Sequence, residues 1–196
     1  QKKNTNIYPK FFRTKTNIED LNCSRFVIRE CDYAFLESRE IFPLFINRKD
    51  QSLIQHIEEN TERLRNIAIM PRGAHINVSD KNISSVPKTG YIPILFGRDI
   101  GKYQIHSPRK FLRWPMKKFL KLRQQHLREK LLVQNLAYKI VAAYDCNGFF
   151  VNDTINTVFI SDRAFPPLYV LAILNSNVIN YYFQNAITNR ARLHMH

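Results

Sequence analysis

The sequence has few cysteines and no long apolar run. Its three cysteines, Cys23, Cys31 and Cys146, are an odd number and lack the Cys-x-x-Cys spacing typical of zinc sites. This pattern argues against a disulfide framework and against a structural zinc site, and it favours a reducing, cytoplasmic setting. The longest apolar stretch, residues 168–174, is far shorter than the roughly 18 residues that a membrane helix needs. We therefore expect no membrane span.

Acidic residues are also scarce. The chain has 30 Lys and Arg against 16 Asp and Glu, which leaves a net charge of +14. Residues 101–144 contain eleven basic residues and a single acidic one, Glu129, whereas residues 19–62 contain ten acidic and five basic residues. Because a clustered positive field steers and holds a polyanion, one face is expected to bind nucleic acid. Composition alone leaves two alternatives, a merely basic surface and a face that docks an acidic protein domain.

The length and the apolar pattern predict an α+β fold that is rich in mixed, mostly antiparallel strands with flanking helices. A chain of 196 residues with 44% hydrophobic residues can bury a sizeable core. Short apolar runs bounded by turn residues predict strands at residues 23–29, 33–36, 67–70, 92–96, 103–105, 131–136, 139–144, 149–151 and 154–160. Residues 1–66 are predicted to be an N-terminal extension or connector with one helix. Residues 67–196 are predicted to be the main domain, packed with the extension as one unit.

Helices are predicted from capping residues and apolar spacing. Asp50 offers an N-cap for a helix that runs to about Arg65. This helix is expected to bury Leu53, Ile54, Ile57 and Leu64. Pro115 can open a second helix, whose inward residues would be Met116, Phe119, Leu120 and Leu127. A proline pair opens a C-terminal pair of helices, and because residues 168–174 are apolar on nearly all sides we expect the first of them to be buried.

Several ordered segments match one known family. Residues 93–103, Pro-Ile-Leu-Phe-Gly-Arg-Asp-Ile-Gly-Lys-Tyr, are similar to a Gly-x-Asp-Ile-x-Arg-Tyr motif in which Lys102 replaces the usual arginine. Further similarities follow at residues 140–145, 152–154, 171–176, 181–183 and 190–195. Together they resemble the TaqI-like C-terminal specificity domain, which lies behind adenine-specific DNA methyltransferase domains. The resemblance covers roughly residue 67 to the end and departs at residues 71–77, where the family commonly has a second Gly-containing turn.

The resemblance implies a target-recognition domain, residues 67–196, of an adenine-specific DNA methyltransferase or a type II restriction–modification enzyme. Such a domain would position double-stranded DNA for a covalently linked catalytic domain outside this chain. S-Adenosylmethionine is expected in that missing domain, and no cofactor in this chain. Gly97, Asp99 and residues 152–154 are expected to have framework roles rather than base contacts. Because the chain starts at Gln1 without an initiating Met, we expect it to be a piece of a longer protein.

Catalytic motifs are missing from the sequence. A methyltransferase needs a Gly-rich cofactor turn and an Asn- or Asp-Pro-Pro-aromatic loop, and Phe165-Pro166-Pro167-Leu168 has neither the polar residue nor the following aromatic. The carboxylates of the basic half lack the tight spacing of a metal-dependent nuclease, which makes a nuclease fragment the least favoured alternative. The His194-Met195-His196 ending is interpreted as chance. We therefore predict no catalytic and no metal-binding residue in this chain.

The remaining candidates are basic side chains that can clamp phosphates or read guanine. They are Arg72, Arg98, Lys102, Arg109, Lys110, Arg113, Lys117, Lys118, Lys121, Arg190 and Arg192. The alternative is recognition of single-stranded or structured RNA, with bases stacked on Phe111, Trp114, Tyr181 or Tyr182.

Overall fold

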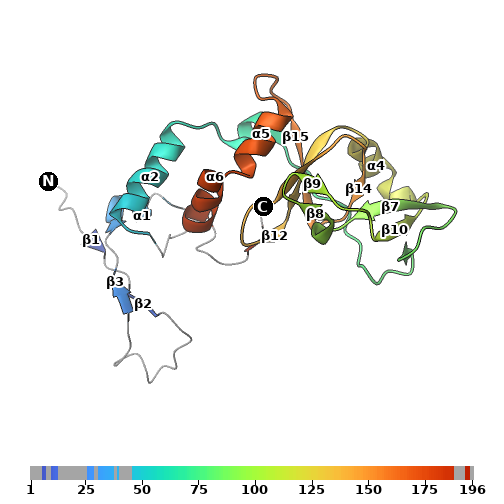
Figure 1. Ribbon diagram of the computed structural model, residues 1–196, viewed down its shortest axis with the longest axis horizontal. Coiled ribbons are helices and arrows are strands. Elements are labelled where there is room, and N and C mark those ends of the chain that lie inside the picture. The colour runs from blue at the N-terminus through green and yellow to red at the C-terminus, as the bar shows by residue number, and fades with distance from the viewer. Residues whose placement is uncertain are drawn as a thin grey trace. The chain divides into compact units, whose positions relative to one another are not determined.

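The computed structural model describes residues 6–7, 10–12, 26–28, 31–37, 39, 46–187 and 193–194 (Figure 1). The chain divides into two compact units, which are described separately. Unit 1 comprises residues 1–61 and 182–191, and unit 2 comprises residues 62–181 and 192–196. The division at residues 66 and 67 that the sequence suggested stays a prediction.

Unit 1 combines two short strand pairs with a small helical core. Its elements are β1 (Asn6–Ile7), β2 (Lys10–Phe12), β3 (Phe26–Ile28), β4 (Cys31–Asp32), α1 (Tyr33–Glu37), α2 (Arg48–Glu59) and η4 (Phe183–Ile187), the last a π-helical turn. Strand β1 pairs with β4 and β2 with β3, both antiparallel. Leu36 of α1, Ile54 of α2 and Ala186 of η4 are buried together. Contacts between helical segments therefore form the core of this unit.

Two predictions for unit 1 are wrong. Residues 33–36, expected as a strand, form α1, in which Phe35 and Leu36 face the α2 core, because tertiary packing overrides their β-type composition. The N-cap of α2 is Asn47 and not Asp50, and the helix ends at Glu59, well before Arg65. The Asn47 side chain accepts from the backbone N–H of Asp50 at 3.1 Å, and the Asp50 carboxylate accepts from the N–H of Asn47 at 2.9 Å. This capping box starts the helix earlier than the apolar spacing indicated.

The burial predicted for α2 is right in part. Ile54 and Ile57 are buried, but Leu53 is 44% exposed and Gln51 is buried in its place. The Gln51 amide donates to the Asp32 carboxylate at 2.8 Å, so a hydrogen bond satisfies this buried polar side chain.

Unit 2 contains two four-stranded sheets. Its elements are α3 (Leu64–Ile67), β5 (Ala68–Ile69), β6 (Ile83–Ser84), β7 (Tyr91–Leu95), η2 (Gly97–Asp99), β8 (Ile100–Gly101), β9 (Gln104–Ile105), β10 (Lys110–Arg113), η3 (Lys117–Phe119), α4 (Leu120–His126), β11 (Lys130–Gln134), β12 (Leu136–Ala137), β13 (Ala142–Asp145), β14 (Phe150–Val151), β15 (Ile155–Ile160), α5 (Pro167–Leu174), α6 (Asn177–Tyr182) and β16 (Leu193–His194). The last residue of α6, Tyr182, is assigned to unit 1. The strand orders are β14-β7-β10-β6 and β13-β11-β15-β5. Within these sheets only the β14–β7 pairing is parallel. The predicted α+β class, mostly antiparallel with C-terminal helices, is confirmed.

The first sheet of unit 2 is covered on both faces. Successive strand residues point to opposite sides of a sheet. Ile94 of β7 and Phe150 of β14 pack with Phe119 of η3, next to α4 (Figure 1). Their neighbours Leu95 and Val151 pack with residues of β11, β13 and β15 in the second sheet. Strands β7 and β14 therefore form the middle layer of unit 2.

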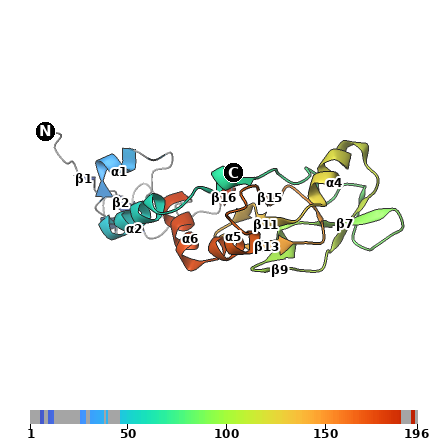
Figure 2. The ribbon, with the colours of Figure 1, turned by 90° about the horizontal axis from the view of Figure 1, so that it is seen from above.

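The C-terminal helices cover the edge of the second sheet at β13, beside which Figure 2 shows α5. The buried Asn175 amide accepts from the N–H of Ala142 at 3.1 Å and donates to its carbonyl at 2.9 Å. Asn180 accepts from the N–H of Ile140 at 2.7 Å. These side chains hydrogen-bond to backbone groups of the kind that an open sheet edge leaves unpaired.

Two helices of unit 2 bury less than expected. Helix α5 begins at Pro167, the second residue of the proline pair that was predicted to open it. Only one of its faces packs on β13, so Leu168 and Tyr169 are 60% and 56% exposed. The helix expected from Pro115 begins instead as the 3₁₀ turn η3 at Lys117. That turn rotates the helical face, so Phe119 is buried while Leu120 and Leu127 are exposed.

Candidate nucleic-acid interface

The segment from Gly97 to Tyr103 is anchored by a buried carboxylate. Asp99 is fully buried at the end of η2, where its Oδ2 accepts from the backbone N–H of Phe96 at 2.9 Å. Its Oδ1 accepts from Nε of Arg109 at 2.9 Å, and Nη2 of Arg109 donates to the carbonyl of Arg98 at 3.0 Å. Asp99 is therefore part of the framework. It fixes both the backbone that carries Arg98 and the guanidinium of Arg109, whose side chain is 54% exposed.

A tight hairpin, β8–β9, presents Lys102 and Tyr103 to solvent. The amide of Gln134 donates to the carbonyls of Gly97 and Ile100 at 2.9 and 2.8 Å, and the N–H of Tyr103 donates to the carbonyl of Ala142 at 2.8 Å. Tyr103 adopts a left-handed φ of 65°, which costs a residue with a side chain roughly 1–3 kcal/mol. The surrounding hydrogen bonds hold this conformation, so the position of the exposed hairpin tip is well defined.

A second group of basic residues lies on β10, η3 and α4. Lys117, Lys118 and Lys121 are exposed, and Nζ of Lys118 lies 4.7 Å from the centroid of the Phe119 ring. On β10, Arg113 is exposed and Nζ of Lys110 donates to the Ser85 hydroxyl at 2.7 Å. We call the three exposed lysines of η3 and α4 the lysine cluster.

A third element is the loop of residues 71–77, which is clamped to the β14–β15 turn. The N–H of Ala74 donates to the carbonyl of Val151 at 2.8 Å, and the carbonyl of Ala74 accepts from the N–H of Asp153 at 3.0 Å. The buried Asn152 amide also donates to the carbonyl of Ile76 at 2.7 Å. Gly73 is required here because a Cβ would lie 2.2 Å from the carbonyl oxygen of Asn152. The loop is a rigid support for its exposed side chains.

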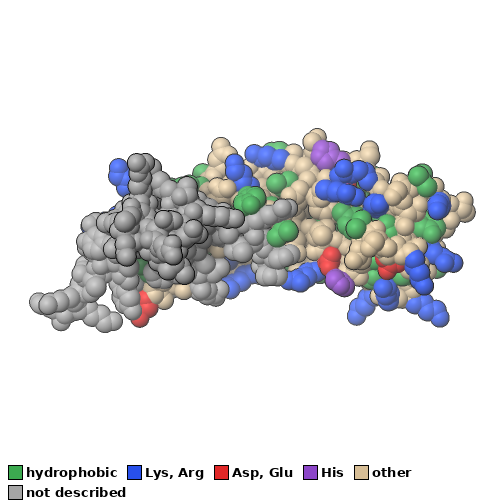
Figure 3. All heavy atoms as spheres, turned by 90° about the horizontal axis from the view of Figure 1, so that it is seen from below, with side chains coloured by type: hydrophobic (Ala, Val, Ile, Leu, Met, Phe, Trp, Pro, Cys, Tyr) green, Lys and Arg blue, Asp and Glu red, His purple; other side chains and the backbone are tan. Residues whose placement is uncertain are grey.

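All of the predicted DNA-binding residues that the structure describes belong to unit 2. Eight are exposed: Arg72, Arg98, Lys102, Arg109, Arg113, Lys117, Lys118 and Lys121. Lys110 is half-buried, and Arg190 and Arg192 lie outside the described residues. Figure 3 shows Lys and Arg side chains at many points of the unit 2 surface in view, with fewer Asp and Glu among them. The structure brings Arg98 and Arg109 into direct contact and places the lysine cluster on one short helical segment.

Residues 92–196, just over half of the chain, match the family described as the TaqI-like C-terminal specificity domain. The chain belongs to this family. The resemblance inferred from the motifs is thereby confirmed, and the chain is a DNA-recognition specificity module of the restriction–modification type. A comparison with curated proteins finds no match.

Not every basic residue of the specificity domain is on its surface. Lys130 is fully buried, and its Nζ donates to the Asp145 carboxylate at 2.5 Å and to the His126 carbonyl at 2.5 Å. Burial lowers the pKa of Lys130, while the hydrogen bond and charge of Asp145 oppose that shift. Arg123, which interrupts the apolar stripe of α4, donates to the carbonyl of Gly148 at 2.6 Å. Sequence counting therefore overstated the charge available to DNA between residues 101 and 144.

His126, next to the Lys130–Asp145 ion pair, is a fully buried structural histidine. His126 packs with its ring centroid 5.1 Å from that of Phe150, and its Nδ1 accepts from the N–H of Val151 at 3.3 Å. Burial, followed by the positive charges of Lys130 and Arg123, lowers the pKa of His126 to about 3. The imidazole is therefore neutral at physiological pH and part of the core.

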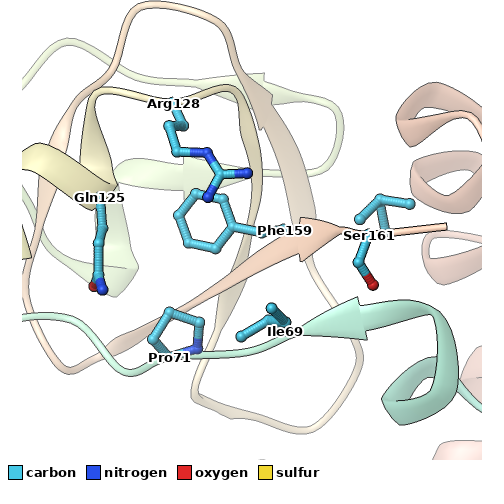
Figure 4. Close-up of a pocket in the computed structure, with 7 residues that line it drawn as sticks. Ile69, Pro71, Gln125, Arg128, Phe159 and Ser161 are labelled. Carbon is cyan, nitrogen blue, oxygen red and sulfur yellow. The ribbon is translucent and has the colours of Figure 1, made fainter. Parts of the chain in front are cut away.

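Unit 2 also has a pocket beside β5 and β15 (Figure 4). It is lined by Ile69, Pro71, Gln125, Arg128, Phe159, Ile160 and Ser161. The Arg128 guanidinium lies 5.3 Å above the Phe159 ring and is the charged group of this lining. Within the described part of the chain, no three His, Cys, Asp or Glu side chains are placed to hold a metal ion. The helices described there are also all too short or too polar to cross a membrane.

Proposed function

We propose that this specificity domain reads the sequence of double-stranded DNA and positions the duplex for a linked catalytic domain outside this chain. That catalytic domain would be an adenine-specific DNA methyltransferase that uses S-adenosylmethionine, or a combined restriction–modification enzyme. The observation that carries the proposal is the set of exposed basic side chains that unit 2 holds on separate, hydrogen-bonded supports. Family membership supports the same reading.

The hydrogen-bonded backbone that carries these basic side chains matters, because phosphate contacts set the register in which base edges are read. Arg98 follows Gly97 on a backbone fixed by Asp99 and Arg109, and Lys102 occupies a hairpin tip fixed by Gln134. Such positions lose little conformational freedom when they meet a rigid duplex. The lysine cluster supplies less directional contacts, which suit phosphates.

The RNA alternative depends on aromatic side chains that can stack on bases. Trp114 packs against the core, with its ring centroid 5.9 Å from that of Phe150. Tyr182 is half-buried, and its hydroxyl donates to the Glu58 carboxylate at 2.6 Å. These two rings are engaged within the protein, and the other two candidates, Phe111 and Tyr181, are half-buried. This favours the duplex over unpaired bases.

Neutralising the lysine cluster with Lys117→Gln, Lys118→Gln and Lys121→Gln is expected to weaken duplex binding by about tenfold to a hundredfold at physiological salt, because phosphate contacts are lost. The loss should be the same for every DNA sequence. Fluorescence anisotropy with labelled duplexes measures it, with single-stranded DNA and RNA of the same sequence as competitors.

The matched control removes three exposed charges elsewhere, with Lys49→Gln, Arg63→Gln and Arg65→Gln. It has the same net charge as the cluster variant and should bind within about twofold of the unmodified chain, because long-range effects of surface charge are screened. Equal losses in both variants would show a non-specific charge effect. A cluster variant with unchanged affinity would assign that face to a protein partner.

A further inference from the structure

His75 is an exposed side chain on the clamped loop of residues 71–77. Its imidazole Nδ1 lies 2.5 Å from Oδ2 of Asp153, 78 residues away in the sequence, while 96% of the side chain is accessible to solvent. The Asp153 side chain is 31% exposed, and its backbone N–H is bonded to the loop. The imidazole is therefore held at one edge and open at the other.

The Asp153 carboxylate determines which nitrogen of the His75 ring can bind a ligand. When Nδ1–H donates to a carboxylate, the neutral ring carries its lone pair on Nε2. In His75 that atom is on the solvent side of the ring, since Nδ1 is the bonded one. In its neutral form, His75 therefore presents a directed hydrogen-bond acceptor on a loop whose backbone is fixed.

The turn that bonds to His75 also contacts the Gly97 segment. The N–H of Gly97 donates to the Thr154 hydroxyl at 2.8 Å, and a Cβ on Gly97 would lie 3.0 Å from the carbonyl of Thr154. Thr154 directly follows Asp153, and Arg98 directly follows Gly97. The loop that carries His75 and the segment that carries Arg98, which are distant in the sequence, therefore both contact the β14–β15 turn.

We propose that His75 reads a base in the major groove by accepting a hydrogen bond at Nε2 from an exocyclic amino group of adenine or cytosine. Asp153 acts as its positioning residue. The inference rests on the proposed function, because it assumes that duplex DNA reaches this surface. A phosphate contact is disfavoured, since the Asp153 carboxylate would repel it, whereas amino groups in the major groove are hydrogen-bond donors that distinguish base pairs.

The test is selection from a randomised duplex library with the full chain, comparing the unmodified protein with His75→Ala and Asp153→Asn. The unmodified protein should select a defined motif. His75→Ala should lose roughly tenfold of the preference at one base position, the size expected for one base contact. Asp153→Asn should weaken the same position to a smaller extent. Affinity for random duplex should stay within about twofold in each variant, because phosphate contacts remain.

The control is His56→Ala, which alters an exposed histidine of unit 1 and should leave the motif unchanged. Unfolding curves of the His75 and Asp153 variants that match the unmodified protein show that the loop is intact. A motif that His75→Ala does not alter, or an equal loss at all sequences, would overturn the role of His75 while leaving the proposed function in place. Duplex binding without any selected motif would overturn both.

Discussion

Raising the salt concentration from about 50 to about 200 mM is expected to weaken duplex DNA binding by roughly a hundredfold to ten-thousandfold. The estimate follows from the exposed basic residues, because each phosphate neutralised releases condensed counterions and adds about 0.9 to the slope of log affinity against log salt. With about four to eight phosphate contacts from the eight exposed candidates, the slope lies between roughly −4 and −7. A salt titration followed by fluorescence anisotropy measures the slope directly.

The lysine-cluster variant provides the internal check on this slope. Removing three lysines should reduce its magnitude by about two to three, because each phosphate contact contributes about one. The charge-matched control variant, with Lys49, Arg63 and Arg65 replaced, should keep the slope of the unmodified chain. A slope near zero would contradict phosphate binding altogether, and the same reduced slope in both variants would contradict the placement of the contacts.

Replacing Lys130 with methionine is expected to destabilise unit 2 by roughly 3–5 kcal/mol. The substitution keeps the apolar stem but leaves the Asp145 carboxylate buried without its countercharge. Asp145 would keep the backbone N–H groups of Asn147, Gly148 and Phe149, at 2.9 to 3.0 Å. These bonds place the expected loss toward the lower end of that interval. Urea unfolding monitored by Trp114 fluorescence measures the change.

A double variant separates the charge from the packing. Lys130→Met combined with Asp145→Asn removes both charges and should recover roughly half or more of the lost stability, because replacing a whole buried pair costs far less than removing one partner. Lys139→Met, at an exposed lysine, should change stability by less than about 0.5 kcal/mol. A Lys130→Met protein as stable as the Lys139 control would contradict a buried ion pair.

Local sequence patterns predicted the sheets of unit 2 better than they predicted unit 1. Apolar runs bounded by turn residues identified β7, β14 and β15, because the residues of these strands pack on both faces and turn residues end them. In unit 1 the same kind of run at Phe35 and Leu36 forms a helix instead. Its conformation is set by contacts with α2 and η4, which are distant in the sequence.

The candidate site was predictable as a region and less so as individual residues. Charge counting pointed to the basic half, but it could not separate exposed lysines from Lys130, whose partner Asp145 lies 15 residues away on a neighbouring strand. Nothing local distinguishes His75, because its proposed role depends on its contact with Asp153, 78 residues away in the sequence. Pairings of this kind arise from sheet topology, which the sequence pattern does not determine.

The central claim, sequence-specific recognition of duplex DNA, is tested most directly by competition. The chain is bound to a labelled duplex that carries the motif selected from the randomised library, and it is then challenged with unlabelled duplex of the same motif or of scrambled sequence at physiological salt. Specific recognition requires roughly a thousandfold less of the motif duplex than of the scrambled duplex for equal displacement. Displacement at equal concentrations of both would contradict the claim.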